Sequence, residues 1–340
     1  MDIFTTGVLR RVVRALPPGE QQANFILNTF FRFEQLDQSE EIHFDVETDK
    51  RRIAPFVAPI VAGQVVASQG YQTKTFRPAY IKDKRVFNAQ RPLKRLIGEQ
   101  PMGAISPAAR MQALLANDLQ DQINMLNRRL ELMAVEALRT GKVIIKGEQY
   151  PEVEVNFQRH GDLTVALTST KRWGEAGVNP IRDLDAWALR IAIHSGAVAN
   201  IVVMDPKAYE LFEASEPVQK LLDRTRASDT LSPTNGELGA VPKGRIGNYE
   251  VWVYTDHYVH PETGETTFYL PDYTVLLVSP SLEGTRCFAA IQDEEANFEA
   301  LPYFPKSWLE KDPAVRYLLM QSAPLMVPYR VNAALCATVR

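Results

Sequence analysis

The sequence predicts an α+β protein built around one long helix, and three observations indicate this fold class. The stretch 107–140 has no glycine, and no proline after its first residue, and its apolar side chains recur every three or four positions. Strand-like segments lie before it, at 64–77, and after it, at 142–157. From about residue 180, helices and strands alternate instead. A length of 340 residues is enough for about two domains of ~150 residues each.

Residues 1–50 are predicted to form an N-terminal arm. Residues 6–16 fit one short amphipathic helix, which the run Pro17-Pro18-Gly19 would end. The segment 25–31 then has five apolar residues in seven, too few to form a core of its own. We therefore expect this apolar plug to be buried against the body of the chain or against a neighbouring molecule.

Charge is distributed unevenly along the chain, although the net charge is only −3. Residues 1–49 sum to −5 and include an acidic block at 37–49. Residues 50–95 hold eleven Lys and Arg against one acid, a net charge of +10, and residues 96–340 sum to −8. The near-neutral total argues against bulk binding of nucleic acid, whereas the segregation indicates complementary surfaces.

The basic stretch 50–95 is predicted to be a long, extended hairpin, which needs support because isolated hairpins are marginal in water. Its interleaved aromatic residues would also suit stacking on bases, so a nucleic-acid-binding packaging protein is one alternative. The charges fall on both faces of a ribbon, however, and an acidic block precedes them. We therefore favour a contact between subunits, in which this hairpin rests on a neighbour's acidic surface at 37–49 or 293–299. The residues expected in that contact are Arg51, Arg52, Lys74, Arg77, Lys82, Lys84 and Arg85, with Asp45, Glu47, Asp49, Asp293, Glu294 and Glu295.

The helix predicted at 107–140 is delimited by local signals at both ends. Ser106 and Pro107 suit the N-cap and the first helical position, and Gly141 suits the left-handed residue that follows a helix. At ~1.5 Å per residue the helix is about 51 Å long, so we call it the spine helix. A sheet is expected to cover its apolar stripe, with strands at 142–146, 152–157 and 316–327.

The region from residue 179 onward is predicted to be a mixed α/β unit. A helix begins at Asn179-Pro180, a buried strand spans 200–204, and Asp205-Pro206 opens the next helix. The stretch 227–247 is rich in glycine and proline and is predicted to be a mobile loop.

No group of residues in the sequence predicts catalysis, and no cofactor or metal is expected. His257 and His260 could each offer a nitrogen to a metal, but they flank a predicted hairpin turn, where polar residues are common. Asp183 and Asp185 lie in the first turn of a helix, where the helix dipole favours acids. The pair His194-Ser195 lacks the flanking glycine of a nucleophile elbow. A two-domain α/β enzyme is therefore the weaker alternative.

Composition and the pattern of apolar residues exclude several other classes. Apolar residues make up 45% and charged residues 23%, as in ordinary globular proteins. The most apolar run, 53–67, contains two prolines and is shorter than the ~18 residues of a membrane span. Cys287 and Cys336 lie far apart in apolar surroundings, which is typical of reduced, buried thiols. No apolar signal segment is visible at the N-terminus. We expect a protein that is made and used without translocation and has no membrane partner.

Seven segments of the sequence resemble the phage major capsid protein E family, the lambda-like group of major capsid proteins. They are 25–31, 57–66, 76–81, 201–207, 270–272, 304–308 and, most clearly, 312–325. None is a chemical motif, but their collinear order from Phe25 to Leu325 makes the resemblance specific. Residues 1–24 match weakly.

The resemblance implies the Hong Kong 97-type capsid fold and supplies names for its parts. These are an N-arm at 1–50, an extended E-loop at 51–100, a peripheral (P) domain at 101–178 with the spine helix at 107–140, an axial (A) domain at 179–284, and a return to the P domain at 285–340. The implied function is a structural subunit, not an enzyme, that assembles into pentamers and hexamers of an icosahedral tailed-phage or prophage head around dsDNA.

The same resemblance implies partners and a location. Expected partners are other copies of the chain, a portal, a decoration protein and packaged dsDNA held by non-specific contact. Since only 24 residues precede Phe25, a fused scaffolding segment of ~100 residues does not fit, and a separate scaffolding protein is expected. Assembly is expected in the host cytoplasm, and the final location is the virion.

Overall fold

A computed structural model describes most of the chain. The described residues are 3–16, 24–47, 71–78, 80–88, 91–94, 99, 105–147, 150–221, 239–311 and 315–340. The helices are α1 (Thr6–Ala15), α2 (Phe25–Phe30), α3 (Pro107–Thr140), α4 (Pro180–Ser195), α5 (Pro206–Ala214) and α6 (Glu216–Leu221). No helix among these residues is both long and apolar enough to cross a membrane.

In the described ranges, the strands form one large sheet and five small ones. The large sheet has the order β7 (Thr164–Ala166), β18 (Ala334–Thr338), β13 (Thr274–Val278), β8 (Ile201–Met204), β10 (Tyr249–Tyr254) and β9 (Ala240–Ile246). Two three-stranded sheets are β1 (Phe33–Asp37), β14 (Gly284–Ala289) and β17 (Pro324–Pro328), and β15 (Phe304–Glu310), β16 (Val315–Ser322) and β4 (Ile81–Asn88). The pairs are β2 (Ile42–Glu47) with β3 (Tyr71–Phe76), β5 (Lys142–Gly147) with β6 (Tyr150–Asn156), and β11 (His257–Val259) with β12 (Thr266–Phe268).

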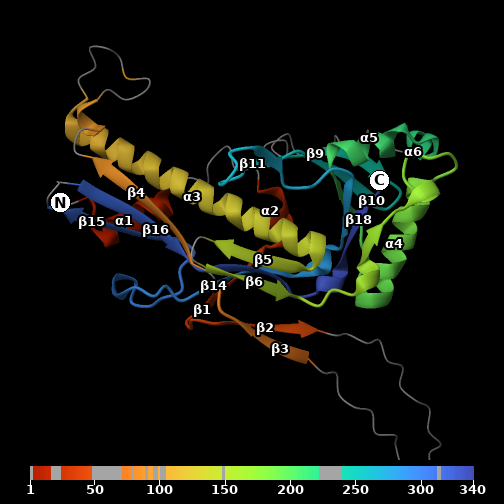
Figure 1. Cartoon of the computed structure of the whole chain (residues 1–340), viewed down its shortest axis with the longest axis horizontal. Helices are drawn as coiled ribbons and strands as arrows, with labels where there is room; N and C mark the ends of the chain where they lie inside the picture. Colours follow the sequence, from red (N-terminus) through yellow and green to blue (C-terminus); the bar gives the residue numbers. More distant parts are fainter. Residues whose placement is uncertain are drawn as a thin grey trace, which may run out of the picture.

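The spine helix is α3, and the predicted bounds are confirmed at both ends. Ser106 caps it by accepting a hydrogen bond from Ala109 N, and Gly141 follows it in the left-handed conformation with φ 70°. The Arg159 guanidinium donates to the carbonyls of Leu138 and Arg139, which would otherwise lack helical partners. Figure 1 shows α3 running along the molecule, with β4, β15 and β16 beside one end and the large sheet with α4, α5 and α6 at the other.

The prediction that a single sheet covers α3 is wrong in detail. The tail strand expected at 316–327 is divided into β16 and β17, which pair with different sheets. Both β5 and β17 pack against α3, but they belong to separate sheets. The spine helix is therefore covered by several small sheets, because a rod of this length outruns any one of them.

The predicted loop at 227–247 is wrong over its last part, which is strand β9. This strand pairs antiparallel with β10 at the edge of the large sheet. Pro242 is tolerated because an edge strand has one side without a ladder partner, and the register shifts opposite Val251 and Trp252, beside Gly244. Residues 222–238, the rest of the predicted loop and the end expected for the preceding helix, lie outside the described residues.

The large sheet draws strands from three of the predicted segments. β8, β9, β10 and β13 come from 179–284, but β7 comes from 101–178 and β18 from 285–340. The boundaries expected from the resemblance therefore do not separate sheets. The division of the subunit into N-arm, E-loop, P domain and A domain within a shell remains a prediction.

The apolar plug of the N-arm is helix α2, and it is buried on its own chain. Phe25, Ile26, Leu27 and Phe30 are all buried. At its start, the backbone N–H groups of Ile26 and Leu27 donate to the Glu131 carboxylate of α3, at 2.9 and 2.8 Å. At its end, Arg286 of β14 donates to the carbonyls of Leu27 and Phe31, at 3.1 and 2.7 Å.

Glu131 is fully buried, and burial raises its pKa to about 7, although hydrogen bonds from Tyr254 and from the two backbone N–H groups of α2 oppose the rise. The Glu131 carboxyl therefore holds its proton more tightly in the folded chain than in the unfolded chain, where its pKa is the ordinary 4.5. Stability from this group is present below pH 4.5 and is lost as the pH rises to 7. We expect Glu131 to lower the free energy of unfolding by about 3 kcal/mol across that window.

This pH dependence can be measured by urea unfolding at a series of pH values. Burial also raises the pKa of other carboxyl groups, among them the buried Asp205 and the half-buried Glu136. The informative quantity is therefore the difference between the native chain and Glu131→Gln. Between pH 4.5 and 7, the free energy of unfolding should fall less in the variant than in the native chain. Equal slopes in the two proteins would contradict the assignment.

The described part of the basic stretch is paired with the body of the chain. β3 pairs with β2 of the N-arm, and β4 pairs with β16. Both are thus supported in sheets, in keeping with the prediction that this stretch lies against something else. The strand expected at 64–68 and most of the remaining E-loop lie outside the described residues.

Candidate assembly surfaces

The two faces of β4 carry different kinds of charge contact. On one face Arg85 is held within the chain, with its guanidinium 2.7 Å from Asp121 of α3 and 3.1 Å from Asp83. On the other face Lys82 and Lys84 are exposed. Lys84 Nζ lies 4.0 Å from the centre of the Tyr317 ring on β16. The exposed face thus combines lysines with aromatic surface, whereas Arg85 is committed to the fold of its own subunit.

The acidic surface at 293–299 also has partners in its own chain. Lys306 Nζ lies 2.9 Å from Asp293 and 3.2 Å from Glu295, and Thr6 of α1 donates to Glu295 at 2.5 Å. Partial burial opposes ionisation of Asp293, but bonds from Lys306, Glu295 N–H and Gln321 hold its pKa below the ordinary value. Glu294 is exposed. Much of this surface therefore anchors α1 and β15 of the same subunit.

The acidic block of the arm meets the basic stretch inside one chain. Asp45 and Glu47 lie on β2 and Lys74 on β3, with Phe44 opposite Lys74 and Asp45 opposite Thr73. Arg77 forms an ion pair with Glu40. Asp49, Arg51 and Arg52 lie outside the described residues. Within the described part, the strands that carry these opposite charges thus pair in the same subunit.

An exposed apolar surface on α4 was not predicted from the sequence. This helix buries Leu184, Trp187 and Ile191, yet Leu189 and Ile193, one turn apart, are 62% and 69% exposed. Val198, just after the helix, is 77% exposed. We call Leu189, Ile193 and Val198 the α4 apolar face. The signal in the sequence was apolar residues on more than one side of the helix, which is typical of a helix that needs a second partner.

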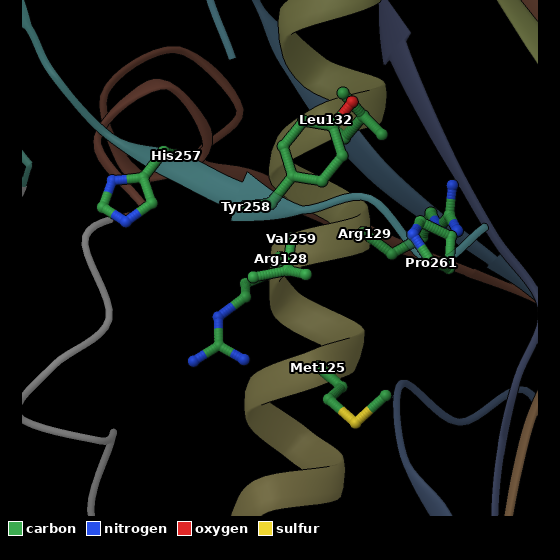
Figure 2. Close-up of a pocket in the computed structure, with 8 residues that line it drawn as sticks. All are labelled: Met125, Arg128, Arg129, Leu132, His257, Tyr258, Val259 and Pro261. Atoms are coloured by element: carbon green, nitrogen blue, oxygen red, sulfur yellow. The ribbon is translucent and has the colours of Figure 1, made fainter. Parts of the chain in front are cut away.

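A pocket of about 450 Å³ lies between α3 and the β11–β12 hairpin (Figure 2). Its walls combine apolar groups with the cationic side chains of two arginines. The lining residues are Met125, Arg128, Arg129, Leu132, His257, Tyr258, Val259 and Pro261. These eight residues include no carboxylate, serine or cysteine. The pocket therefore offers apolar surface and two guanidinium groups, which point in different directions (Figure 2).

The residues that the sequence raised as possible chemistry have structural roles. Asp183 accepts a hydrogen bond from Trp173 Nε1 at 2.9 Å, and Asp185 accepts one from the Tyr249 hydroxyl at 2.8 Å. The Ser195 hydroxyl donates to the carbonyl of Ile191 in its own helix. His260 Nδ1 accepts from the backbone of its turn, and His257 lines the pocket. None of these contacts joins a nucleophile to a base.

Comparison with solved structures identifies the architecture. A structure described as a prophage capsid protein of E. coli CFT073 aligns over 100% of both chains, with a TM-score of 0.79 and 22% sequence identity. A phage-related protein from Bordetella bronchiseptica RB50 aligns over 97% of this chain and 95% of its own, with a TM-score of 0.57 and 12% identity. The fold is thus the Hong Kong 97-type fold of phage capsid proteins, as predicted.

The chain belongs to the phage major capsid protein E family, whose model matches residues 5–339. The major capsid protein of Escherichia phage lambda is 32% identical over 340 residues, with 96% of each chain covered. The major capsid protein of Enterobacteria phage P21 is 34% identical over the same length and coverage. The resemblance drawn from the sequence is confirmed, and it extends into the arm that the sequence matched weakly. Neither the packaging protein nor the α/β enzyme is supported.

Proposed function

We propose that this chain is the major structural subunit of a tailed-phage or prophage head, and that it assembles into the pentamers and hexamers of an icosahedral shell around dsDNA. One observation carries the proposal: 96% of the chain aligns with 96% of a lambda major capsid protein at 32% identity. Two features of the fold agree with it. The α4 apolar face needs a cover, and the β2–β3 pair projects from a body organised along the spine helix.

The subunit acts by binding copies of itself rather than by catalysis. Its partners are proposed to be neighbouring subunits, a separate scaffolding protein, a portal, a decoration protein and packaged DNA contacted without sequence preference. Assembly takes place in the host cytoplasm and the product is the virion shell. The axial unit around α4 is proposed to meet its neighbours at the centre of each pentamer or hexamer.

Electron microscopy of the chain, expressed together with the neighbouring genes, tests this function. Closed shells of uniform size are expected. Only soluble monomers or amorphous material, under conditions in which the chain is folded by circular dichroism, would contradict the proposal. Retention of DNA by unassembled subunits, with a steep loss as salt rises, would instead favour the packaging protein.

The basic loop is proposed to contact a neighbour through residues that its own chain leaves exposed. Lys82 and Lys84 meet this condition, whereas Arg85 and Arg77 are paired internally. Arg51 and Arg52 belong to the same proposal from their charge alone. A surface ion pair contributes only about 0–1 kcal/mol, but the contact is repeated at every subunit of a shell.

Lys82→Glu/Lys84→Glu is expected to abolish shell formation while leaving the subunit folded. Reversing two charges turns each attraction into a repulsion, and both side chains point away from α3. Shell yield by sedimentation and the melting temperature of the subunit are the two measurements. Lys82→Gln/Lys84→Gln, which removes the charges without reversing them, should assemble with an intermediate yield. Native yield from the Glu variant would show that this face is not an interface.

A further inference from the structure

Two histidines and an aspartate from distant parts of the chain meet at one surface. His160 precedes the short helix η2 (Gly161–Leu163), Asp162 lies within it, and His194 lies in the last turn of α4. One nitrogen from each imidazole and one carboxylate oxygen all lie within 4.8 Å of one another. The capsid function proposed above assigns no role to this cluster.

The backbone on both sides of the cluster is fixed by its surroundings. His160 N–H donates to Asn332 Oδ1 at 2.8 Å, and Leu163, at the end of η2, is fully buried. On the other side Ser195 is buried, and Arg330 donates to its carbonyl at 2.8 Å. The backbone at these three residues is therefore already close enough for their side chains to reach one another without a large movement of the chain.

Two of the three distances between ligand atoms match those of a tetrahedral metal site. Asp162 Oδ2 lies 3.5 Å from His160 Nδ1 and 3.3 Å from His194 Nε2. Ligand atoms at about 2.1 Å from a tetrahedral ion are separated by about 3.4 Å, so the carboxylate oxygen already stands at the correct distance from both nitrogens. The two rings are stacked, with centres 3.8 Å apart and planes 22° apart, and an imidazole nitrogen binds a metal in the plane of its own ring. The His160 ring, whose side chain is 49% exposed, must therefore turn out of the stack for both nitrogens to face one ion.

We propose that His160, Asp162 and His194 form a binding site for a divalent transition-metal ion of the zinc class. Two imidazole nitrogens and one carboxylate suit Zn²⁺, Co²⁺ or Ni²⁺, whereas Mg²⁺ and Ca²⁺ prefer oxygen ligands only. With three protein ligands, the fourth position is open to water. The Asp162 N–H bond to His160 Nδ1 is long, 3.3 Å, and is the contact that the metal would replace.

Metal binding would tie α4 to the segment that follows β6. Without the ion, these two parts are linked at this surface by the ring stack and by a 3.3 Å hydrogen bond from Arg190 to the carbonyl of Asp162. An ion with ligands on both sides would replace the ring stack with a crosslink that exists only in the folded chain. Bound metal should therefore raise the melting temperature of the subunit.

The test is titration of the purified full-length subunit with ZnCl₂, followed by calorimetry, and with CoCl₂, followed by visible absorption. We expect one ion per chain, a tetrahedral Co²⁺ spectrum and a higher melting temperature with Zn²⁺. His160→Ala/His194→Ala should weaken affinity at least tenfold and remove the thermal shift. Asp162→Asn tests the third ligand in the same way.

The matched control is His257→Ala/His260→Ala, which removes two histidines on the β11 hairpin and should bind like the native chain. Equal affinity in the native chain and His160→Ala/His194→Ala would overturn the proposal. So would loss of the signal in the control variant, or an octahedral Co²⁺ spectrum. Because the readout is binding by the isolated subunit, failure here is independent of whether the chain forms shells.

Discussion

Glu131→Ala is expected to destabilise the subunit by about 3–5 kcal/mol, because three buried donors lose their acceptor and the shorter side chain leaves a cavity. The Glu131 side chain is fully buried and accepts three hydrogen bonds, from Ile26 N and Leu27 N of α2 and from the Tyr254 hydroxyl of β10. The variant leaves all three donors without this acceptor and opens a cavity between the arm, the spine helix and the large sheet. The midpoint of urea unfolding measures the loss.

The same change should loosen the N-arm before the rest of the chain. α2 has only six residues, too short to be stable alone, and it is held at its start by Glu131 and at its end by Arg286. Hydrogen exchange at Ile26 and Leu27 should therefore accelerate more than exchange in α3. Removing the arm's anchor should also lower the yield of shells.

Tyr254→Phe is the matched control for this experiment. It removes the 2.6 Å hydrogen bond to Glu131 but keeps the ring and both backbone donors, so a loss of about 1 kcal/mol is expected. If Glu131→Ala costs no more than Tyr254→Phe, the carboxylate does not anchor α2. Unchanged exchange at α2 in a destabilised Glu131→Ala would lead to the same conclusion.

Elements fixed by local signals could be predicted from the sequence, and α3 is the clearest case. The cap residue Ser106, the proline after it and Gly141 lie within the helix or beside it, so no distant contact is needed to place its ends. Strand β9 is the opposite case. Pro242 and Gly244 predict a break in regular structure, and the segment forms an edge strand because it pairs with β10. The local signals correctly indicated weak strand propensity, but pairing with β10 determined the structure of this segment.

Contacts between residues far apart in the sequence could not be predicted, because no local pattern indicates them. Glu131 lies beside the apolar stripe of α3, and the sequence alone gives no reason to expect it to be buried. It is buried because α2 packs on it, and its hydrogen-bond partner Ile26 is 105 positions away in the sequence. The charged segments are an instructive case. Their complementarity was visible in the sequence, but whether β2 and β3 pair within a subunit or between subunits was not. His160 and His194 likewise meet only because η2 packs against α4.

Leu189→Asp/Ile193→Asp is expected to abolish assembly at concentrations at which the native chain forms shells, and to leave the isolated subunit folded. Both side chains are more than 60% exposed on α4, whereas Leu184 and Trp187 on the same helix hold it to the body. Burying a Leu or Ile side chain contributes about 1.5–3 kcal/mol when it is fully removed from water, so a partly exposed pair contributes somewhat less at each contact. An aspartate at either position makes the contact unfavourable, because its charge would be buried in the interface without a partner.

The graded variant Leu189→Ala/Ile193→Ala separates lost apolar contact from introduced charge. It should raise the concentration needed for assembly without abolishing it, whereas the Asp variant should remain monomeric in sedimentation at every accessible concentration. The melting temperatures of both should lie close to the native value, because neither side chain is in the core. Shells of native yield from the Asp variant would mean that the α4 apolar face points to solvent or DNA in the assembled head. A large fall in melting temperature would mean that these side chains support the fold of the subunit and not its contacts.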